Sequence, residues 1–371
     1  MSNDIKVEVL GAGSIGNHLA HACRNKGWSV RMSDLDPAAL ERTRTEIYPE
    51  RYGSWDEGIE LRVADGNLDI GDADLVIIGT PPDSHSKLIL DSLKSGNPKV
   101  ILVEKPLATP DLKGCAEVWK AANESDCTVL VDYNHTATPN TEFAEQLLAG
   151  DSLGTPRTIQ VRWIEHWGGI YKAHPWLSGP AATYLGFSSR GGGACGEHSH
   201  GINIWQHFAK RAGAGRVVEV SAMLDQVSEG GADYDRVCQL NLRAESGLCG
   251  FVVQDVVTDP AVKSVRFQGE SGFFEWHANF ESGFDAVIHG DAAKQETERF
   301  AKGRPDDFKG MIEQVGRLIS GELSPDNAVG KLEDGLETML VIAAAFESQK
   351  TGKTIKIDYS QGFSAAALTQ V

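Results

Sequence analysis

The sequence has few cysteines, and none of them has the spacing of a disulfide framework or a zinc site. Six cysteines are scattered over 371 residues, and no two form a Cys-x-x-Cys pair. In a chain of this length such cysteines are typical of free thiols in a reducing compartment. Apolar runs of about eighteen residues are absent, and so is a basic leader followed by an apolar segment. We therefore expect a cytoplasmic protein that does not span a membrane.

The sequence also has fewer basic residues than acidic ones. The chain has 35 Lys and Arg against 52 Asp and Glu, a net charge of −17. Such a surface repels nucleic-acid phosphates and anionic lipid head groups, so we expect a small-molecule partner, no nucleic acid and no membrane. The length favours two domains, and 41% hydrophobic residues are enough to give each of them a core.

The first part of the chain, residues 1–135, alternates strand-like and helix-like segments. This order is typical of an α/β fold with a doubly wound parallel sheet, the Rossmann arrangement. A helical stretch runs from His85 to Ser95 and ends at Gly96. The expected strands are residues 5–10, 28–34, 73–80, 99–104 and 127–132.

The second part, residues 136–371, predicts an α+β domain that binds substrate and holds subunits together. Its strand-like runs are separated by glycine-bearing turns, which indicates an antiparallel meander in a large, open, mostly antiparallel sheet. Helical spacing occurs in 308–322 and from Leu332 to Phe346, and the last helix, about 328–350, is expected to pack back on the first domain. The expected strands are 217–227, 236–257, 263–276 and 284–291.

The glycine run GAGSIG, residues 11–16, follows the first expected strand and opens a helix. Gly11 permits a tight turn, Gly13 lets backbone amides reach a pyrophosphate, and Gly16 allows close packing of helix and strand. A helix amino terminus also stabilises negative charge. The run therefore predicts a dinucleotide site, although a purely structural turn is the alternative.

Asp34 ends the second expected strand, near the offset at which dinucleotide folds place an acid. Its carboxylate can accept hydrogen bonds from both ribose hydroxyls and would repel a 2′-phosphate, so NAD is preferred over NADP. Asp34 could instead cap the helix that starts near Pro37, a role equally open to Asp36. Arg31 is close enough in the sequence to leave NADP open as the less favoured cofactor.

Three further motifs follow the ends of expected strands: TPPDSH (80–85), EKP (104–106) and VDYNHTATP (131–139). The carboxyl ends of parallel strands form the edge at which doubly wound folds bind ligands. Together with GAGSIG and the later GGGACGEHSHGIN (191–203), this order resembles the Gfo/Idh/MocA oxidoreductases, the family of glucose-fructose oxidoreductase and inositol dehydrogenase. The resemblance continues to the closing AAAFESQKTGKTIKID (343–358).

The resemblance implies roles for residues at these strand ends. Lys105 matches the family lysine between nicotinamide and substrate, and the peptide bond to Pro106 is often cis in the family. Glu104 matches an acid on the nicotinamide ribose. The cofactor contacts expected in all are Gly11, Gly13, Ser14, Ile15, Gly16, Asp34, Thr80, Pro81, His85, Glu104, Lys105 and Asn134. The resemblance also implies a homodimer or homotetramer formed through the carboxy-terminal sheet.

The sequence departs from the family pattern in two places. The family's second-domain site normally has an aspartate four residues before a histidine or tyrosine, but Gly196 stands four residues before His200. The acid's work then falls to Glu197, one position later, or to a residue elsewhere. The family also tends to carry an arginine before the proline of the sixth-strand turn, where this chain has Thr136 and Ala137.

The chemistry of alcohol oxidation agrees with these residue types. A hydroxyl must lose its proton as hydride leaves for nicotinamide, and a histidine with a pKa near its ordinary ~6.5 can accept that proton. Lys105 would stabilise the developing alkoxide, which makes Lys105 and His200 the expected catalytic pair. Glu197, His200 and Asn203 would share one face if the run is helical, so Glu197 could orient His200. An inert His200 is the alternative.

Other chemistries fit the run 191–203 less well. His198 and His200, with His166 and His174, could hold a metal, but the HExxH pattern and paired cysteines are missing, so we expect no metal. Ser188 and Ser199 lack the GxSxG context of a nucleophile. Cys195 is interpreted as a core thiol.

The segment 163–187 is rich in aromatic side chains and imidazoles between glycines and prolines. These groups suit the faces and hydroxyls of a sugar ring, so the segment is expected to be a substrate loop. Packing at a subunit contact is an equal alternative. The substrate-binding residues expected from the whole sequence are Lys105, His166, Trp167, Tyr171, His174, Trp176, Glu197 and His200.

The sequence thus predicts an NAD-dependent oxidoreductase that moves hydride between nicotinamide and a ring hydroxyl or ketone of a sugar, an inositol or a sugar derivative, free or nucleotide-linked. Two alternatives stay open. Some relatives hydrolyse glycosides through transient oxidation by bound NAD, and others are non-catalytic regulators that sense the dinucleotide.

Overall fold

The computed structural model describes residues 5–172 and 174–371, which form two compact units. The amino-terminal unit contains the chain up to Ala108 together with 114–134 and 305–332, and the carboxy-terminal unit contains 109–113, 135–304 and 333–371. The first long segment of the carboxy-terminal unit begins at His135. Residues 305–332 return to the amino-terminal unit.

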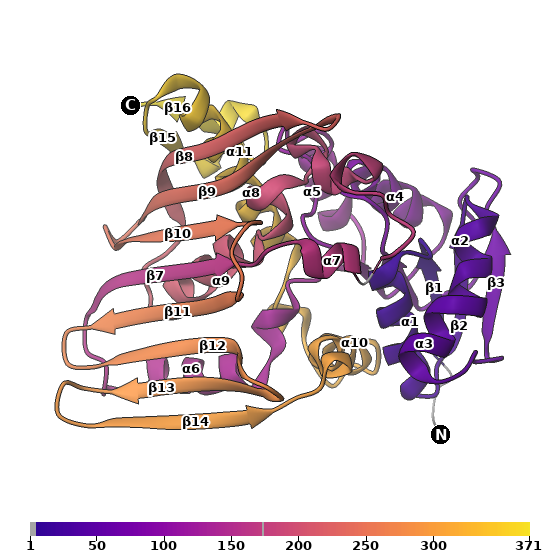
Figure 1. The fold of residues 1–371 in the computed structure, drawn as a ribbon, viewed down its shortest axis with the longest axis horizontal. Coiled ribbons are helices and arrows are strands. Elements are labelled where there is room, and N and C mark those ends of the chain that lie inside the picture. The colour runs from indigo at the N-terminus through magenta and orange to yellow at the C-terminus, as the bar shows by residue number, and fades with distance from the viewer. Residues whose placement is uncertain (1–4, 173) are drawn as a thin grey trace. The chain divides into compact units, whose positions relative to one another are not determined.

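The amino-terminal unit contains a six-stranded parallel sheet in the order β3-β2-β1-β4-β5-β6. Its strands β1, β2 and β3 are labelled in Figure 1. β4, β5 and almost all of β6 are buried apolar runs, because helices cover both faces of such a sheet. The predicted Rossmann architecture is confirmed. The strands are β1 (Lys6–Leu10), β2 (Ser29–Asp34), β3 (Ile59–Val63), β4 (Leu75–Ile78), β5 (Val100–Val103) and β6 (Thr128–Val131).

All helices of this unit except α10 lie between strands of the parallel sheet that follow one another in the sequence. The strand order reverses between β1 and β4, so the connections that leave these two strands diverge at their carboxyl ends. α4 starts at Pro82, three residues before the predicted start at His85, and ends where expected. The helices are α1 (Ser14–Asn25), α2 (Pro37–Arg42), the π-helical η1 (Thr43–Ile47), α3 (Tyr48–Tyr52), α4 (Pro82–Ser95), α5 (Cys115–Asn123) and α10 (Lys309–Ile319).

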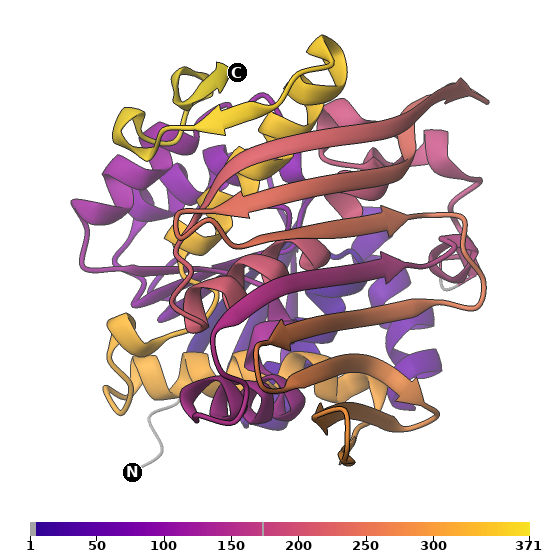
Figure 2. The same ribbon diagram turned by 90° about the vertical axis from the view of Figure 1, so that its left-hand side faces the viewer.

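The carboxy-terminal unit contains a ten-stranded sheet in the order β14-β13-β12-β11-β7-β10-β9-β8-β15-β16, seen across its face in Figure 2. Neighbouring strands run antiparallel except β7 and β10, which pair in parallel from Thr158 with Cys249 to Ile164 with Asp255. The sheet is therefore mostly antiparallel as predicted, but it is not a simple meander. Its strands are β7 (Pro156–Ile164), β8 (Val217–Glu229), β9 (Ala232–Ala244), β10 (Cys249–Asp255), β11 (Val262–Gly269), β12 (Phe273–Glu281), β13 (Phe284–Gly290), β14 (Gln295–Ala301), β15 (Ile355–Ile357) and β16 (Leu368–Gln370).

Helices cover one face of this sheet. α6 packs on β12 and β13, and α9 packs on β7, β10 and β11, where the buried rings of Trp205, Phe208 and Phe274 fill the core. The helices are α6 (Pro139–Ala149), α7 (Gly168–Lys172), α8 (Gly193–Glu197), α9 (His200–Arg211) and α11 (Leu332–Thr351). Short 3₁₀ turns lie at Asn134–Ala137, Pro180–Ala182, Tyr184–Gly186, Ser188–Arg190, Arg304–Phe308, Pro325–Asn327, Tyr359–Gln361 and Ala365–Ala367.

The last long helix, α11, belongs to the carboxy-terminal unit from Glu333 onward, whereas α10 belongs to the amino-terminal unit. Among the described helices, none is both long and apolar enough to cross a bilayer.

Candidate functional site

The glycine turn is fixed on the parallel sheet by backbone bonds. Gly11 N donates to Ser33 O at 2.8 Å, and Ala12 N donates to the Asp34 carboxylate at 2.7 Å. A Cβ added to Gly16 would lie 2.1 Å from Gly11 O, so only glycine permits this approach of helix to turn. α1 begins at Ser14. The amides at its start are therefore available to an anionic ligand, as a dinucleotide pyrophosphate requires.

The surroundings of Asp34 favour a cofactor without a 2′-phosphate. Asp36, not Asp34, caps α2, because its carboxylate accepts from Ala38 N at 2.9 Å. Arg31 donates to the buried Glu8 carboxylate and, at 3.0 Å, to Asp69 O. Because these bonds hold its guanidinium away from the end of β2, Arg31 does not supply the cation that a 2′-phosphate needs.

His85 joins two of the turns at the carboxyl edge of the sheet. Its Nε2 lies 2.7 Å from Thr80 O and its Nδ1 lies 3.1 Å from Pro106 O. Burial lowers the pKa of His85 to about 4, outweighing the carbonyls that favour the charged ring. The neutral imidazole therefore supports the turns that carry Thr80 and Lys105, and both its nitrogens lie against protein carbonyls. Pro81 precedes α4 as its N-cap residue.

The ends of β5 and β6 bring several polar groups to this edge. Lys105 precedes Pro106 through a cis peptide bond, as the resemblance implies. Asn134 is only 7% exposed, and its Oδ1 has no hydrogen-bond partner in the described parts of the chain. An unpaired buried amide oxygen fits a ligand that carries N–H donors, such as the nicotinamide carboxamide. The residues present at this edge therefore fit a dinucleotide.

Asp132 is a group at this edge that sequence reasoning missed. It follows β6 directly and is 1% exposed. Its carboxyl group interacts with that of Glu104, which follows β5 in the neighbouring strand position. The signal was present in VDYNHTATP, where an acid follows a buried strand in the same way as in VEKP.

In the carboxy-terminal unit, the run 191–203 forms two short helices rather than one. α8 ends at Glu197 and α9 begins at His200, with Ser199 as the residue before it. The continuous helix on which a face shared by Glu197, His200 and Asn203 depended is not formed, because His198 and Ser199 separate α8 from α9. His200 and Asn203 remain three residues apart on α9. Glu197 accepts from the Tyr184 hydroxyl at 3.3 Å instead.

Gly196 explains why no acid stands four residues before His200. A Cβ at this position would lie 2.2 Å from Gly191 O, a backbone atom that cannot move aside alone. An aspartate would thus require a different backbone between the glycines and α8. The same close backbone packing therefore explains both the glycine-rich entry to α8 and the absence of an acid at position 196.

The His200 imidazole packs against the rings of two other side chains. It stacks on Trp163 with ring centroids 5.5 Å apart, and His135 meets it edge to face at 5.0 Å. Trp276 stacks in turn on Trp163 at 6.0 Å. Sequence reasoning did not assign His135, although it lies in the quoted motif VDYNHTATP.

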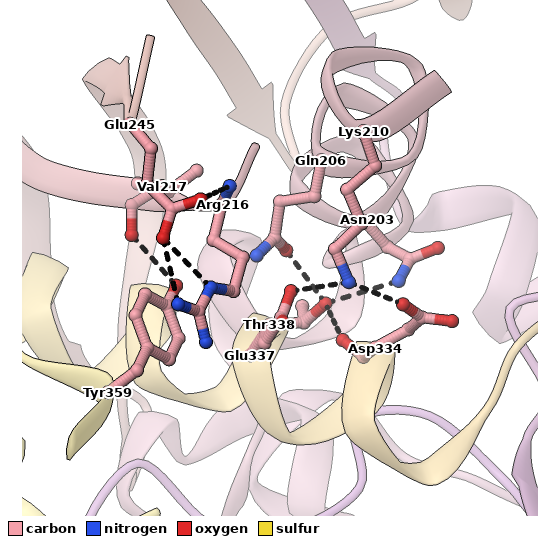
Figure 3. Close-up of polar contacts among 10 residues, drawn as sticks. All are labelled: Asn203, Gln206, Lys210, Arg216, Val217, Glu245, Asp334, Glu337, Thr338 and Tyr359. Atoms are coloured by element: carbon pink, nitrogen blue, oxygen red, sulfur yellow. Dashed lines mark hydrogen bonds and ion pairs between the residues drawn. The ribbon is translucent and has the colours of Figure 1, made fainter. Parts of the chain in front are cut away.

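The helix that begins at His200 is anchored to α11 by polar side chains (Figure 3). Asn203 Nδ2 donates to Thr338 Oγ1 at 3.2 Å, and that hydroxyl also bonds to Gln206 Oε1 at 2.9 Å. Lys210 pairs with Asp334 and with Glu337, each at 2.7 Å. Burial raises the pKa of Glu337 to about 7, although Lys210 opposes the shift. These contacts fix the direction of α9 and thereby the position of its first residue.

The aromatic segment 163–187 is partly core. Trp163 and Trp167 are buried, and the Trp167 ring lies 4.7 Å from that of Tyr234 and 5.6 Å from that of Tyr171. His166 is exposed, and its Nδ1 accepts from Gly168 N at 2.9 Å. His174 and Trp176 are half-buried, with ring centroids 5.2 Å apart. The segment thus contains both packing side chains and accessible ones.

Ser188 and Cys195 have structural roles around Asp235. Ser188 Oγ donates to the buried Asp235 carboxylate at 2.6 Å, and Cys195 N donates to it at 2.7 Å. Burial raises the pKa of Asp235 to about 7 despite these bonds. The prediction that Cys195 is a core thiol is confirmed, since it is fully buried. In the described residues, His, Cys, Asp and Glu side chains form no group of three or more suited to a metal ion.

Comparison with known proteins agrees with this geometry. Residues 5–133 match the family model "Oxidoreductase family, NAD-binding Rossmann fold". Over these residues, which are about a third of the chain, the sequence is similar to the Gfo/Idh/MocA oxidoreductase family. The matched segment contains the glycine turn, Asp34, Thr80 and the EKP motif, so it holds every dinucleotide contact predicted for the chain except Asn134.

Curated proteins that are similar to this chain include inositol 2-dehydrogenases. That of Rhizobium meliloti is 26% identical over 180 residues, 45% of this chain and 51% of the relative. Inositol 2-dehydrogenase 1 of Paenarthrobacter aurescens is 31% identical over 121 residues, 32% of each chain. The chain thus matches about half of the first relative's length and about a third of the second's.

Solved structures share the fold over nearly the whole chain. An oxidoreductase from Agrobacterium radiobacter, in complex with NAD⁺, L-tartaric acid and magnesium, has a TM-score of 0.72 at 19% identity, with 95% of this chain and 98% of that chain covered. Levoglucosan dehydrogenase in complex with NADH has a TM-score of 0.75 at 16% identity, with coverage of 95% and 99%. At these identities the likeness establishes the fold.

Proposed function

We propose that the protein is an NAD-dependent dehydrogenase that exchanges hydride between nicotinamide and a ring hydroxyl or ketone of a sugar, an inositol or a sugar derivative. The observation that carries the proposal is the carboxyl edge of the parallel sheet. The glycine turn, Asp34 and the EKP lysine lie there in the segment that matches the NAD-binding family model, and the unpaired Asn134 oxygen follows that segment directly. The inositol 2-dehydrogenase relatives and the fold of levoglucosan dehydrogenase support a polyhydroxylated ring as substrate.

We assign each residue a part of the dinucleotide according to its position in the fold. The glycine turn and the amides at the start of α1 hold the pyrophosphate, and Asp34 accepts hydrogen bonds from the adenosine ribose. Thr80 and Glu104 contact the nicotinamide half, and Asn134 accepts from its carboxamide. NAD, when bound, supplies the hydride acceptor.

Proton transfer is assigned to His200 and Lys105. The His200 imidazole takes the proton of the substrate hydroxyl, and the Lys105 ammonium stabilises the negative charge on that oxygen. The separation of α8 from α9 leaves Glu197 a role in binding substrate hydroxyls through its carboxylate, beside the hydroxyl of Tyr184. His166, Tyr171, His174 and Trp176 are the side chains of segment 163–187 that we assign to the substrate, since each has exposed surface.

A substrate panel tests this function. Purified protein is mixed with NAD⁺ and each of a set of inositols, aldoses, anhydrosugars and nucleotide sugars, and NADH absorbance is followed. The panel is repeated with NADP⁺ and, for the corresponding ketones, with NADH. Reduction of NAD⁺ by at least one cyclic polyol, at higher kcat/KM than with NADP⁺, is expected. Absence of turnover with every compound in both directions would refute the proposal.

The open face of the ten-stranded sheet is the surface we propose for self-association. Large apolar side chains are exposed on its strands, among them Met223 at 70%, Phe280 at 38% and Phe284 at 37%. Exposed apolar side chains on the strands of a sheet are typical of a surface that a second subunit covers.

A further inference from the structure

Two acidic side chains lie beside each other at the ends of β5 and β6. Val103 pairs with Val131 in the parallel ladder, so the next residues, Glu104 and Asp132, follow adjacent strands. Asp132 N donates to Val103 O at 2.8 Å, which fixes the start of this turn. Glu104 is 8% exposed and Asp132 is 1% exposed. The carboxyl groups therefore meet away from bulk water.

The contact between the two carboxyl groups requires a proton. Ionised carboxylates only accept hydrogen bonds, so the Asp132 and Glu104 carboxyl groups can hydrogen-bond to each other only when one of them carries hydrogen. Neither oxygen of Asp132 has a hydrogen-bond donor in the described part of the chain. Burial raises the pKa of Asp132, and this effect exceeds the lowering by Glu104 and by the charge of Lys105. Two neighbouring buried carboxylates resist full ionisation for the same reason.

Lys105 is the cation that this pair faces. Its backbone N donates to Glu104 Oε2 at 3.3 Å, and its charge acts on Asp132. Within the amino-terminal unit, Glu104 and Lys105 are the charged groups that act on the Asp132 carboxyl. With one shared proton the pair has a charge of −1, which balances the lysine ammonium.

We propose that Asp132 and Glu104 form an acid pair that stores one proton for Lys105 and so keeps that lysine charged during the reaction. The proposal rests on the proposed function. In the direction of ketone reduction, the substrate oxygen takes a proton from the Lys105 ammonium. The stored proton then passes to the lysine amine, and the pair becomes two carboxylates. Water then returns one proton to the pair when the product leaves. Only protons move between the acid pair, Lys105 and the substrate oxygen. The hydride moves separately and does not change the charge of the acid pair or of Lys105.

Asp132 is thus a positioning residue that acts through Lys105. The second domain lacks the expected aspartate, and Asp132, in the amino-terminal unit, is an acid beside Lys105. This assignment connects two observations. Gly196 excludes an acid four residues before His200, and Asp132 places one beside the catalytic lysine instead.

Infrared spectroscopy tests the stored proton without substrate. A protonated carboxyl group has a carbonyl band that ionised carboxylates lack. At about pH 6, where an ordinary aspartate is ionised, the spectrum of the full-length wild-type protein minus that of Asp132→Asn should contain this band. The matched control is Asp126→Asn, an exposed aspartate just before the opposite end of β6. Its difference spectrum should lack the band.

Kinetics test the use of that proton. Asn can keep a hydrogen bond to Glu104 and leaves one negative charge in place, so Asp132→Asn removes chiefly the transferable proton. We expect kcat to fall about tenfold or more, with unchanged KM for NADH and unchanged NAD⁺ affinity by calorimetry. Asp126→Asn should retain wild-type kcat.

The outcomes are separable from those of the proposed function. A missing acid band, or a kcat equal to wild type, would overturn the acid pair. If Asp132→Asn does not fold, the difference spectrum with Glu104→Gln decides, since either substitution breaks the shared proton. If no substrate is turned over, the proposed function fails, while the infrared result still decides whether the pair holds a proton.

Discussion

Ala12 and Asp34 are joined by a hydrogen bond of 2.7 Å from the backbone nitrogen of the glycine turn to the carboxylate at the end of β2. Asp34 therefore holds the turn, and we propose that its remaining lone pairs accept hydrogen bonds from a ribose. We expect Asp34→Ser to weaken NAD⁺ binding about tenfold and to reduce the preference over NADP⁺, because both the acceptor and the repulsive charge are lost. Calorimetric titration with both dinucleotides measures this.

Asp36→Ala is the matched control for Asp34. It removes the cap of α2 and should cost about 1 kcal/mol of unfolding free energy without a change in cofactor preference. A preference for NAD⁺ that survives Asp34→Ser would contradict our assignment.

Lys105→Met is expected to abolish turnover while the dinucleotide still binds. The methionine keeps the length of the side chain but cannot stabilise an alkoxide, so kcat should fall by about 10²–10³ or more. Lys99→Met, which removes an exposed lysine paired with Asp74, serves as the control. Unchanged turnover in Lys105→Met would remove the catalytic role and favour a dinucleotide-sensing regulator.

His200→Ala and His207→Ala separate chemistry from packing on one helix. Loss of the imidazole at His200 should lower kcat by about 10²–10⁴, since the proton acceptor is gone. His207 instead pairs with Glu145 at 2.6 Å, so its substitution should lower the melting temperature and leave kcat near wild type. Equal kcat losses in the two variants would show that the effect comes from disturbing α9.

The stability of the protein should depend on pH through Asp235. Its pKa is about 7 in the folded protein and lies in the ordinary aspartate range when the chain is unfolded. The folded state thus holds a proton that the unfolded state releases. This contribution to stability is fully present below the unfolded pKa and is lost as pH rises through about 7.

Urea unfolding of Asp235→Asn at a series of pH values tests this dependence. The variant should lose less stability than wild type between mildly acidic and mildly alkaline pH. Asp233→Asn, an exposed position two residues earlier on β9, should follow the wild-type curve. Parallel curves for wild type and Asp235→Asn would contradict the burial argument.

Met223→Glu is expected to weaken self-association. The side chain is 70% exposed on β8, so a charge there should cost little in the monomer but would be desolvated in a sheet-to-sheet contact. Sedimentation equilibrium should show a shift toward monomer. Leu35→Glu changes an equally exposed apolar residue outside the sheet and should leave the molecular mass unchanged. A monomeric wild-type protein would refute the proposed interface.

The parallel sheet was predictable because its strands are short apolar runs followed by motifs with special backbone needs. β3 (IELRV) was not predicted from the sequence, because it lies at the sheet edge and mixes charged with apolar residues. β7 was missed in the same way, since PRTIQVRWI alternates arginine and glutamine with apolar residues. Its parallel pairing with β10 depends on contacts about ninety residues apart, which local patterns do not encode.

For the candidate site, the sequence motifs identified several functional side chains but not the residues that these side chains contact in the fold. GAGSIG, Asp34 and EKP stand where their spacing indicated, because strand ends fix their positions. The break between α8 and α9 was not predictable from helical spacing, which assumed one continuous helix through Glu197 and His200. His85 and Asp132 depend on tertiary neighbours: one ring bridges two turns, and one carboxyl meets another across adjacent strands.

The return of residues 305–332 to the amino-terminal unit has a consequence for synthesis on the ribosome. The six parallel strands emerge early, yet Lys331 bridges Leu130 of the edge strand β6 and α10 packs on β5 and α1. The amino-terminal unit therefore cannot finish folding until almost the whole chain has been translated. A fragment that stops at residue 135 lacks this last layer, and we expect it to expose apolar surface and to require chaperones, whereas the full chain does not.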